Sequence, residues 1–594
     1  MLQPGNRLTL VDAMRPPLGF GLDSAMAVTF TLDLRALLAA PAAFVLGATS
    51  GGREDAGQTE PVELLHALRS HAGRLTVFSQ VGEIALPPAR RVFTFLERVV
   101  VPVTAPLRGV VHPKVWVLRY SSEGSAPRLR VLVGSRNLTF DESWDTIVRL
   151  DESADGVGAD LSQVGRLFDG LLRHARGPVA AEHAERVNSL VQALETTRFA
   201  LPAGVDELNV HVLGFATGTS PLPADVDRSL IVSPFVNDEF FTSVHPHPVD
   251  ALVSRPESLD RLGEGSRARI GQTYTFDDGS AFELRAADER RSPRDPGRPL
   301  VGLHAKVFAF ERGRQARVLL GSANATGAAF ARNIEILLEL VGAKHVIGID
   351  RLCGGTDDEN GLDTLFLTYD AAGGDIDDVP VSSLDAARRQ LAGIPVEGVV
   401  EESGQEWAVT YRTRSPVPHT DGLDVECWPL STAGNRRPVP TGQPLEVRFE
   451  TALENVCAFL AFRIAGDEEE TAFVVPVDLA GVPEARDRAL LRALIGSSDR
   501  FFRYLLAMLD DDPGREGFLD IPETAGDTRA EGKGPAGSTP VLEKLVRAMR
   551  RDPAKLAALH PLISDLSRDN ALPAEFGELW ALIHEAAFPG GDGA

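Results

Sequence analysis

The sequence predicts an α/β fold built from two similar halves, followed by a small β-sandwich and a helical C-terminal region. Three observations predict it. A stretch with His-x-Lys beside one apolar run and Gly-Ser-x-Asn after a second run occurs twice, in residues 111–139 and 303–326. Strand-like apolar runs alternate with amphipathic helices up to about residue 395. Short alternating strand patterns follow from about residue 400, and helical patterns follow from Pro483.

The chain has 594 residues, which is too long for a single core, so several domains are expected. An acidic stretch rich in Gly and Pro predicts a flexible linker, and Thr539-Pro540 after it is typical of a helix start. The expected division is a first half at 1–200, a second half at 201–395, a β-sandwich-like domain at 400–480, helices at 483–510, the flexible linker at 511–538 and a C-terminal helical region at 539–594.

Within each half the pattern predicts the elements in order. In the first half we expect strands over residues 27–34, 74–80, 99–103, 112–120, 129–133 and 146–150, with helices over residues 35–46, 60–71, 161–176 and 180–197. In the second half we expect a connection over 201–227, strands over 229–235, 301–310, 317–320 and 334–340, and an insertion or long loops over 256–300. Five alternating strands between residues 407 and 477 predict the sandwich.

Composition limits the function classes. The net charge of −24 argues against a chain coated in basic surface for nucleic acid, although residues 1–200 hold as many basic as acidic residues, so a local basic groove is compatible with it. No apolar run reaches the ~18 residues that a membrane span needs, and no membrane association is expected. The three cysteines are far apart and form neither a disulfide framework nor a metal spacing, which favours a reducing cytoplasm.

Lysine usage points to the repeated stretch. Most of the 60 basic residues are arginine, and two of the few lysines, Lys114 and Lys306, stand in matching positions of the repeat. A sequence that otherwise prefers arginine but keeps these two lysines indicates that the positions need an ammonium group rather than a planar guanidinium.

The repeated stretch supplies the candidate site. Residues two apart on a strand share a face, so His and Lys of each His-x-Lys should project together, as should Ser and Asn of each Gly-Ser-x-Asn. If the two strands of each half pair and the halves face each other, all these side chains converge on one pocket. The candidate catalytic residues are His112, Lys114, Ser135, Asn137, His304, Lys306, Ser322 and Asn324.

Such a pocket suits phosphate chemistry. Several donors, two of them cationic, would surround an anion, with an imidazole on either side of it. One imidazole can attack phosphorus and form a phosphohistidine, and the other can protonate the leaving oxygen and then activate water. No carboxylate cluster suited to Mg²⁺ or Zn²⁺ stands beside the motifs, so we expect no metal and no other cofactor.

These residues resemble the signature of the phospholipase D superfamily, which carries His-x-Lys followed by Gly-Ser-x-Asn twice per active site. The resemblance covers roughly residues 25–390 in layout and is specific only over the two motif stretches. It implies two phospholipase D-like α/β halves packed as a pseudo-dimer, with one active site between them. It also implies phosphodiester hydrolysis through a phosphohistidine, and by family habit His112 would be the nucleophile.

The sequence departs from the family pattern in one respect. The family often has an aspartate five positions after each lysine, where this chain has Arg119 and Glu311. The aspartate is absent too in the tyrosyl-DNA phosphodiesterase branch, so the chain is more similar to that branch and to nuclease-like members than to the lipid hydrolases. A downstream acid usually orients a histidine in this family, and Glu335 fits that role, with Asp145 as a possible orienting acid for the other half. Arg136 is a candidate for contacting substrate phosphate.

Three functions compete at this point. The first is a nuclease or DNA-end phosphodiesterase acting on DNA or RNA in a bacterial defence or repair system, with residues 400–594 suited to a partner such as a helicase or ATPase. The second is a phospholipase or phosphatidyl transferase, against which stands the lack of a membrane segment or basic amphipathic helix. The third is a catalytically inactive nucleic-acid-binding module, against which stands the completeness of both motifs.

Overall fold

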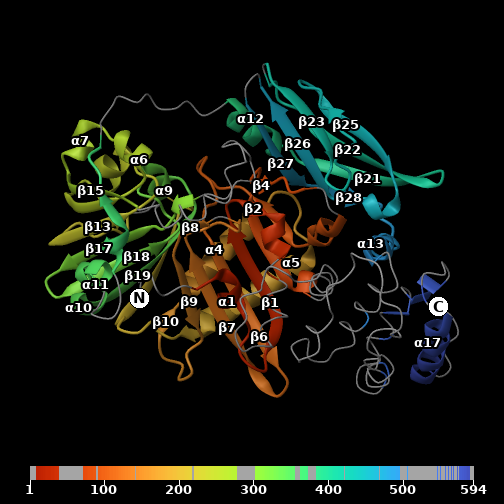
Figure 1. Cartoon of the computed structure of the whole chain (residues 1–594), viewed down its shortest axis with the longest axis horizontal. Coiled ribbons are helices and arrows are strands. Elements are labelled where there is room, and N and C mark those ends of the chain that lie inside the picture. The colour runs from red at the N-terminus through yellow and green to blue at the C-terminus, as the bar shows by residue number, and fades with distance from the viewer. Residues whose placement is uncertain are drawn as a thin grey trace, which may run out of the picture.

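The computed structural model is mixed α/β, as the sequence predicts (Figure 1). It describes most of the chain up to residue 495 and scattered positions after it. The described residues are 8–38, 40, 71–88, 91–140, 142–216, 220–276, 301–354, 361–371, 383–420, 422–466, 469–495, 505, 545, 549, 556, 559, 560, 563, 564, 566, 567, 572 and 574–588.

A six-stranded sheet, here called the first sheet, carries the first copy of the repeat. Its strand order is β5-β3-β1-β6-β7-β9. The first three of these strands run parallel to one another, and β6, β7 and β9 continue the sheet in antiparallel pairs. The strands are β1 (Gly21–Thr29), β3 (Leu75–Gln80), β5 (Val100–Val103), β6 (Val115–Ser122), β7 (Ser125–Gly134) and β9 (Ile147–Asp151).

An eight-stranded sheet, the second sheet, repeats this arrangement around the second copy. Its order is β12-β19-β18-β17-β13-β14-β15-β20, and the six strands from β15 to β19 match the first sheet in order and direction. Two edge strands are added. The strands are β12 (Glu207–Leu213), β13 (Arg228–Val232), β14 (Val249–Val253), β15 (Ile270–Phe276), β17 (Val307–Arg312), β18 (Gln315–Gly321), β19 (Glu335–Ala343) and β20 (Phe366–Thr368).

The repeat strands bury both of their faces. Val115 and Val117 of β6 point into one core, while Trp116 between them points into another, as the two-residue period of a strand requires. The core that holds Val115 also holds Val307 of β17, so a single apolar cluster extends across both sheets. Phe308 of β17 points to a separate cluster on the outer side of the second sheet. The two sheets therefore share one core, and this core fixes the ends of their strands relative to one another.

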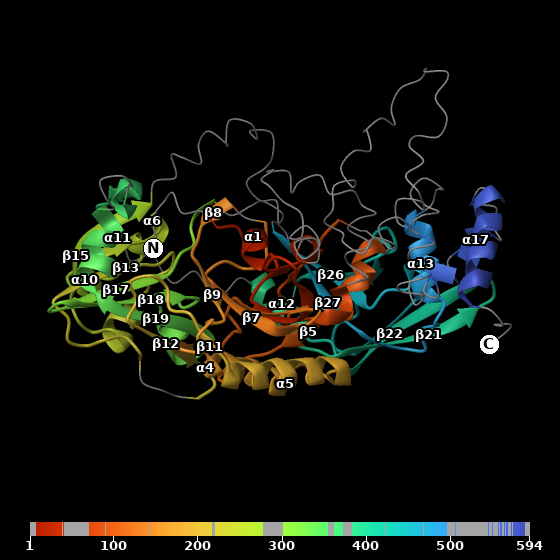
Figure 2. The ribbon, with the colours of Figure 1, turned by 90° about the horizontal axis from the view of Figure 1, so that it is seen from below.

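Helices cover the first sheet on one side. Helices α4 (Ser162–Arg173) and α5 (Ala181–Thr196) pack together and line its lower face in Figure 2. The remaining regular segments are short. They are α1 (Leu10–Met14), α6 (Pro256–Asp260), α7 (Glu264–Arg267), α9 (Gly327–Ala331), α10 (Lys344–Ile347), α11 (Ile349–Gly354), α12 (Ser383–Ala392), and η1 (Ala72–Arg74), η2 (Arg91–Leu96), η3 (Phe240–Val244), η4 (Leu362–Leu365) and η5 (Leu453–Asn455).

Two further sheets enclose a core of their own beyond residue 396. One has the order β25-β22-β21-β28 and the other β2-β4-β27-β26-β23-β24, so β2 (Leu32–Asp33) and β4 (Ile84–Ala85) join it from the N-terminal part of the chain. The other strands are β21 (Val396–Ser403), β22 (Glu406–Pro416), β23 (Asp424–Pro429), β24 (Arg437–Pro438), β25 (Pro444–Thr451), β26 (Phe459–Ala465), β27 (Glu470–Pro476) and β28 (Asp478–Ala480).

Helices follow these sheets. Helix α13 (Arg486–Ile495) packs near η2 and η5, and α17 (Ala574–Ala587) lies near the C-terminus. Leu491 of α13 and Trp580 of α17 belong to one apolar cluster. The predicted linker at 511–538 lies outside the described residues, as does most of the helical region expected to begin at residue 539.

Several predicted elements differ from the structure. The segment expected to be a connection contains strand β12, and the segment expected to be an insertion contains β15 before residues 277–300, which lie outside the described residues. Each of these strands has seven residues; β12 alternates apolar Leu208, Val210 and Val212 with polar residues, as a half-buried strand does, whereas β15 carries few aliphatic residues. Before residue 27, where the sequence pattern predicts no element, the structure has α1 and the start of β1. The predicted helix over residues 60–71 lies almost wholly outside the described residues.

In the part of the chain that the structure describes, no helix is both long and apolar enough to cross a membrane.

A buried ion pair joins α13 to the first part of the chain. Arg486 Nη1 lies 2.8 Å from Glu97 Oε2, and the two side chains are 6% and 5% exposed. Glu97 Oε1 also accepts a hydrogen bond of 2.6 Å from the Ala458 amide. Burial raises the pKa of Glu97, and Arg486 opposes that shift.

We predict that Arg486→Leu lowers the thermal stability of the chain, because it leaves a buried carboxylate without its cation, a change that costs about 3 kcal/mol. Differential scanning calorimetry should show a midpoint several degrees lower. Arg414→Leu is the matched control, since Arg414 is 85% exposed and its 2.6 Å pair with Glu397 contributes little. Equal melting of both variants and the unaltered protein would contradict the prediction.

Candidate active site

Both His-x-Lys segments lie at strand ends rather than within strands. His112 and Lys114 precede β6, which begins at Val115, and His304 and Lys306 lie between β16 (Val301–Leu303) and β17. The expectation that strand geometry alone aligns the two side chains is therefore wrong. Each lysine is instead tied to its own histidine, because Lys114 Nζ donates to the His112 carbonyl at 2.5 Å and Lys306 Nζ donates to the His304 carbonyl at 2.6 Å.

Each Gly-Ser-x-Asn follows a strand end and is held by its serine. Ser135 Oγ accepts a hydrogen bond of 2.9 Å from the Thr146 amide, and Ser322 Oγ accepts one of 3.0 Å from the Ile336 amide. Both serines are fully buried. Each serine thereby fixes the start of the next strand in its sheet. The segment just before that strand is then held against the site.

The two sheets exchange hydrogen bonds next to the histidines. The His112 amide donates to the Ile334 carbonyl at 3.0 Å, and the His304 amide donates to the Trp144 carbonyl at 2.8 Å. Strand β16, which precedes His304, also pairs in parallel with β8 (Glu142–Trp144). Each histidine is thus held by a backbone hydrogen bond to the opposite half of the chain, and the two contacts are reciprocal.

Register places Asp145 where Glu335 stands in the other sheet. The glycine of each Gly-Ser-x-Asn pairs with a residue of the next strand, Ile147 in the first sheet and Leu337 in the second. Two residues before each partner stand Asp145 and Glu335. These two acids are therefore equivalent in position in the two sheets.

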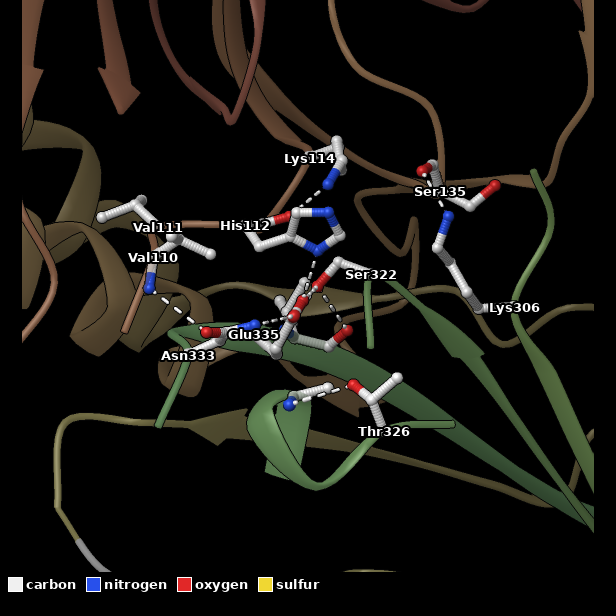
Figure 3. Close-up of polar contacts among 12 residues, drawn as sticks. Val110, Val111, His112, Lys114, Ser135, Lys306, Ser322, Thr326, Asn333 and Glu335 are labelled. Atoms are coloured by element: carbon white, nitrogen blue, oxygen red, sulfur yellow. Dashed lines mark hydrogen bonds and ion pairs between the residues drawn. The ribbon is translucent and has the colours of Figure 1, made fainter. Parts of the chain in front are cut away.

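Glu335 binds His112 across the two sheets. Its Oε2 lies 2.9 Å from His112 Nδ1 and accepts a hydrogen bond of 2.5 Å from Ser322 Oγ (Figure 3). Glu335 is fully buried, and the His112 side chain is 14% exposed. Because a carboxylate accepts, the hydrogen on His112 lies on Nδ1, which leaves the lone pair on Nε2. Asn333 Nδ2 lies 3.4 Å from Glu335 Oε1 and holds the other oxygen.

Lys306 reaches across the site in the opposite direction. Its Nζ lies 3.4 Å from the Ser135 carbonyl of the first copy (Figure 3). This contact is in addition to its bond to the His304 carbonyl. It also lies 3.2 Å from His304 Nδ1. An ammonium has donors and no acceptor, so Nδ1 of His304 accepts here and the ring carries its hydrogen on Nε2. The two histidines therefore hold opposite tautomers.

Burial and charge keep the site histidines neutral. Burial lowers the pKa of His304 far below its usual range, and the cations Lys306, Lys114 and Arg255 lower it further. Burial also lowers the pKa of His112, although Glu335 opposes that shift. The pKa of Lys114 falls well below its usual value because its ammonium is buried.

Both asparagines have an unused oxygen. Asn137 Oδ1 and Asn324 Oδ1 are buried, and neither has a hydrogen-bond partner among the described residues. An unsatisfied buried polar atom costs free energy, so two of them at equivalent positions indicate that a ligand completes the site. If the amide is turned over, the same position offers N–H donors to an anion.

Asp145 and Arg136 interact at the edge of the site. Arg136 Nε lies 3.4 Å from Asp145 Oδ2, and both side chains are about one-third exposed, at 28% and 30%. They line a small cavity together with Lys114 and Asn137. The structure therefore brings Arg136 next to the predicted site residues.

Four positioning residues were missed from sequence. Thr29 Oγ1 accepts from the residue after Asn137 at 3.0 Å, and Ser233 Oγ accepts from the residue after Asn324 at 2.9 Å. Gln80 and Arg255 hold the residues before the two histidines, as described below. These residues share no motif, and only the equivalence of strand ends reveals them.

Among the described residues, no group of three or more His, Cys, Asp or Glu side chains is arranged to hold a metal ion.

A comparison with protein-family models finds no match, and a comparison with curated proteins finds none either. Among solved structures, a mutant of yeast tyrosyl-DNA phosphodiesterase is similar with a TM-score of 0.28 and 11% identity, over 55% of this chain and 82% of that one. A polyphosphate kinase from Porphyromonas gingivalis is similar with a TM-score of 0.27 and 13% identity, over 56% of this chain and 41% of that one. Similarity this low does not indicate a function, so the contacts within the site have to indicate it.

We predict that stability falls on acidification partly because of His304. The unfolded imidazole takes up a proton near pH 6.5, whereas the folded ring stays neutral because its pKa is lowered. Below that pH the unfolded state binds more protons, so stability decreases as pH falls through 6.5, by roughly 1 kcal/mol at pH 5.5. Thermal midpoints at pH 7.5 and 5.5 should differ less in His304→Gln than in the unaltered protein.

His345→Gln is the control for this measurement, because His345 is exposed on α10, and it should leave the difference between the two midpoints unchanged. A His304→Gln protein with the full pH dependence would show that the buried ring is protonated in the folded state.

Proposed function

We propose that this chain is a metal-independent phosphodiesterase of the phospholipase D superfamily that acts through a phosphohistidine. Its substrate is DNA or RNA, and its setting is a bacterial defence or repair system. In this proposal the two copies of the repeat form a pseudo-dimer with a single active site between them. The bond between His112 Nδ1 and Glu335, which come from different copies, carries the proposal.

The tautomers of the two histidines support separate roles. His112 presents the lone pair of Nε2, and the carboxylate at Nδ1 stabilises the positive charge that the ring gains when Nε2 bonds to phosphorus. His112 is therefore the nucleophile. His304 is the acid and base of the reaction, and Lys114, Lys306, Asn137 and Asn324 bind the phosphate oxygens.

Substrate binding prepares the first step. A phosphodiester anion attracts the two lysine ammonium groups, and its charge raises the pKa of His304, so that the ring takes up a second proton, at Nδ1. His112 Nε2 then forms a bond to phosphorus while the bond from phosphorus to the leaving oxygen breaks. The leaving oxygen keeps that electron pair and takes the Nε2 proton of His304.

The second step reverses the roles. His304 now has its hydrogen on Nδ1 and a lone pair on Nε2, which removes a proton from water as the water oxygen attacks phosphorus. The phosphorus–nitrogen bond breaks, and its electrons return to His112 Nε2. Asp145, equivalent in position to Glu335, is the proposed acceptor for the Nδ1 hydrogen of His304 at this stage.

Aromatic and arginine side chains beside the histidines support a nucleic acid substrate. The Phe30 ring lies 5.4 Å from the His112 ring. On the other side, the Arg255 guanidinium lies 5.0 Å above Phe235, which is 45% exposed. Unpaired bases stack on such aromatic faces, and arginine contacts the backbone that joins them.

We predict that the purified protein cleaves single-stranded DNA or RNA in EDTA, and that His112→Ala and His304→Ala each lower the rate by roughly 10³-fold or more, since each removes a reacting group. A panel of single-stranded DNA, double-stranded DNA, RNA and phospholipid vesicles measures this. Denaturing gels should show a covalent phosphoenzyme in His304→Ala but not in His112→Ala. Cleavage that requires Mg²⁺, or that survives both substitutions, would refute the mechanism.

Glu335→Gln is predicted to lower kcat by roughly 10²-fold with little change in KM, because it removes the charge that stabilises the phosphohistidine. Glu339→Gln is the matched control, since Glu339 lies on the same strand and binds His211 at 3.0 Å. Equal rates in the two variants would show that the carboxylate at His112 plays no part in the reaction.

A further inference from the structure

Gln80 and Arg255 occupy the same place in the two sheets. Val28 of β1 and Val232 of β13 are equivalent, because each pairs with the third residue after a site histidine. On its other side each valine pairs with the neighbouring parallel strand, β3 or β14. Two residues past those partners stand Gln80 and Arg255. Gln80, the last residue of β3, and Arg255, two residues past the end of β14, therefore stand at equivalent positions at the carboxyl ends of parallel strands.

Both residues hold the backbone in front of a histidine. Gln80 Oε1 accepts a hydrogen bond of 2.8 Å from the amide of Val111, the residue before His112. Arg255 donates through Nε and Nη2 to the carbonyl of Leu303, the residue before His304, at 3.2 and 2.9 Å. In both sheets the side chain therefore fixes the backbone of the residue before the histidine. The charge differs, because one side chain is a neutral amide and the other a permanent cation.

The charged groups around the two histidines also differ, and those around His304 are the more positive. His112 has the Glu335 carboxylate at 2.9 Å. His304 has cations around it, and the acid equivalent to Glu335, Asp145, lies beside Arg136. The charged and titratable groups that act on His304 are Lys306 next to it, Lys114 and His112 from the segment before β6, and Arg255 after β14. The acids of the site are Asp145 after β8, which lies beside Arg136, and Glu335 at the start of β19, which binds His112.

We propose that Arg255 is a positioning residue that makes the two histidines unequal, by fixing the backbone at Leu303 and keeping a positive charge beside His304. This inference rests on the proposed phosphodiesterase function, and it adds a reason why His112 is the nucleophile while His304 is the acid and base. In the free protein Arg255 helps to keep His304 neutral. When a phosphodiester anion enters, its charge offsets Arg255 and the lysines, and His304 takes up its proton only with substrate in place.

The test compares Arg255→Gln, which gives the second sheet the side chain of the first, with Arg255→Lys, which keeps the charge. In Arg255→Gln the His304 pKa should rise, so the alkaline limb of the kcat–pH profile should move to higher pH by roughly half to one unit. Arg255→Lys should leave the limb in place. Gln80→Ala removes the equivalent hydrogen bond without changing charge, so it should lower the rate without moving the limb.

A second measurement on the full-length protein does not need activity. NMR of ¹³C-histidine-labelled protein saturated with inorganic phosphate, which stands in for the phosphodiester anion, with His304→Gln to assign the signal, should show His304 titrating at higher pH in Arg255→Gln than in the unaltered protein and in Arg255→Lys. An unchanged titration, or an equal shift in Arg255→Lys, would overturn the proposal. Absence of cleavage in the unaltered protein would refute the phosphodiesterase instead, while the NMR result would still decide the role of the charge.

Discussion

The site depends on one reciprocal set of backbone hydrogen bonds between the two sheets. The His112 amide donates to the Ile334 carbonyl, and the His304 amide donates to the Trp144 carbonyl, so each bond joins the two halves of the chain. An acid follows each of these carbonyls, and after Ile334 it is Glu335, so the bond that fixes His112 also brings a carboxylate to its ring, whereas Asp145 after Trp144 lies beside Arg136. A shift of one residue in either strand register would turn that acid to the other face and break the site. The core shared by the sheets resists such a shift.

The sequence predicted which residues lie together at the site better than it predicted how they are held there. The eight motif residues do lie at equivalent strand ends, and Glu335, which the family resemblance suggested as an orienting acid, does contact a histidine, His112. The reason given for their convergence was wrong, since the His-x-Lys segments precede their strands. The alignment of lysine and histidine comes from hydrogen bonds to backbone carbonyls, which no periodicity encodes.

What the sequence could not provide depends on contacts between distant residues. Gln80 lies 31 positions before Val111, and Arg255 lies 48 before Leu303, with no pattern to connect them. Strand β12 at the edge of the second sheet and strand β15 between β14 and β20 were not predicted, and the pairing of the sheet holds both in place. Similarly, β2 and β4 are two residues each and are ordered by their sheet rather than by propensity.

The equivalence of the two copies makes their differences informative. Where both copies keep the same residue type, as with His, Lys, Ser and Asn, the pocket needs two of it. Where they differ, as with Gln80 against Arg255 and Asp145 against Glu335, both differences leave more positive charge around His304 than around His112. In the proposed two-step reaction the two histidines have different tasks, because one ring bonds to phosphorus while the other transfers protons. The differences outside the motifs would supply that asymmetry, and they leave the motif residues of the proposed anion pocket the same in both halves.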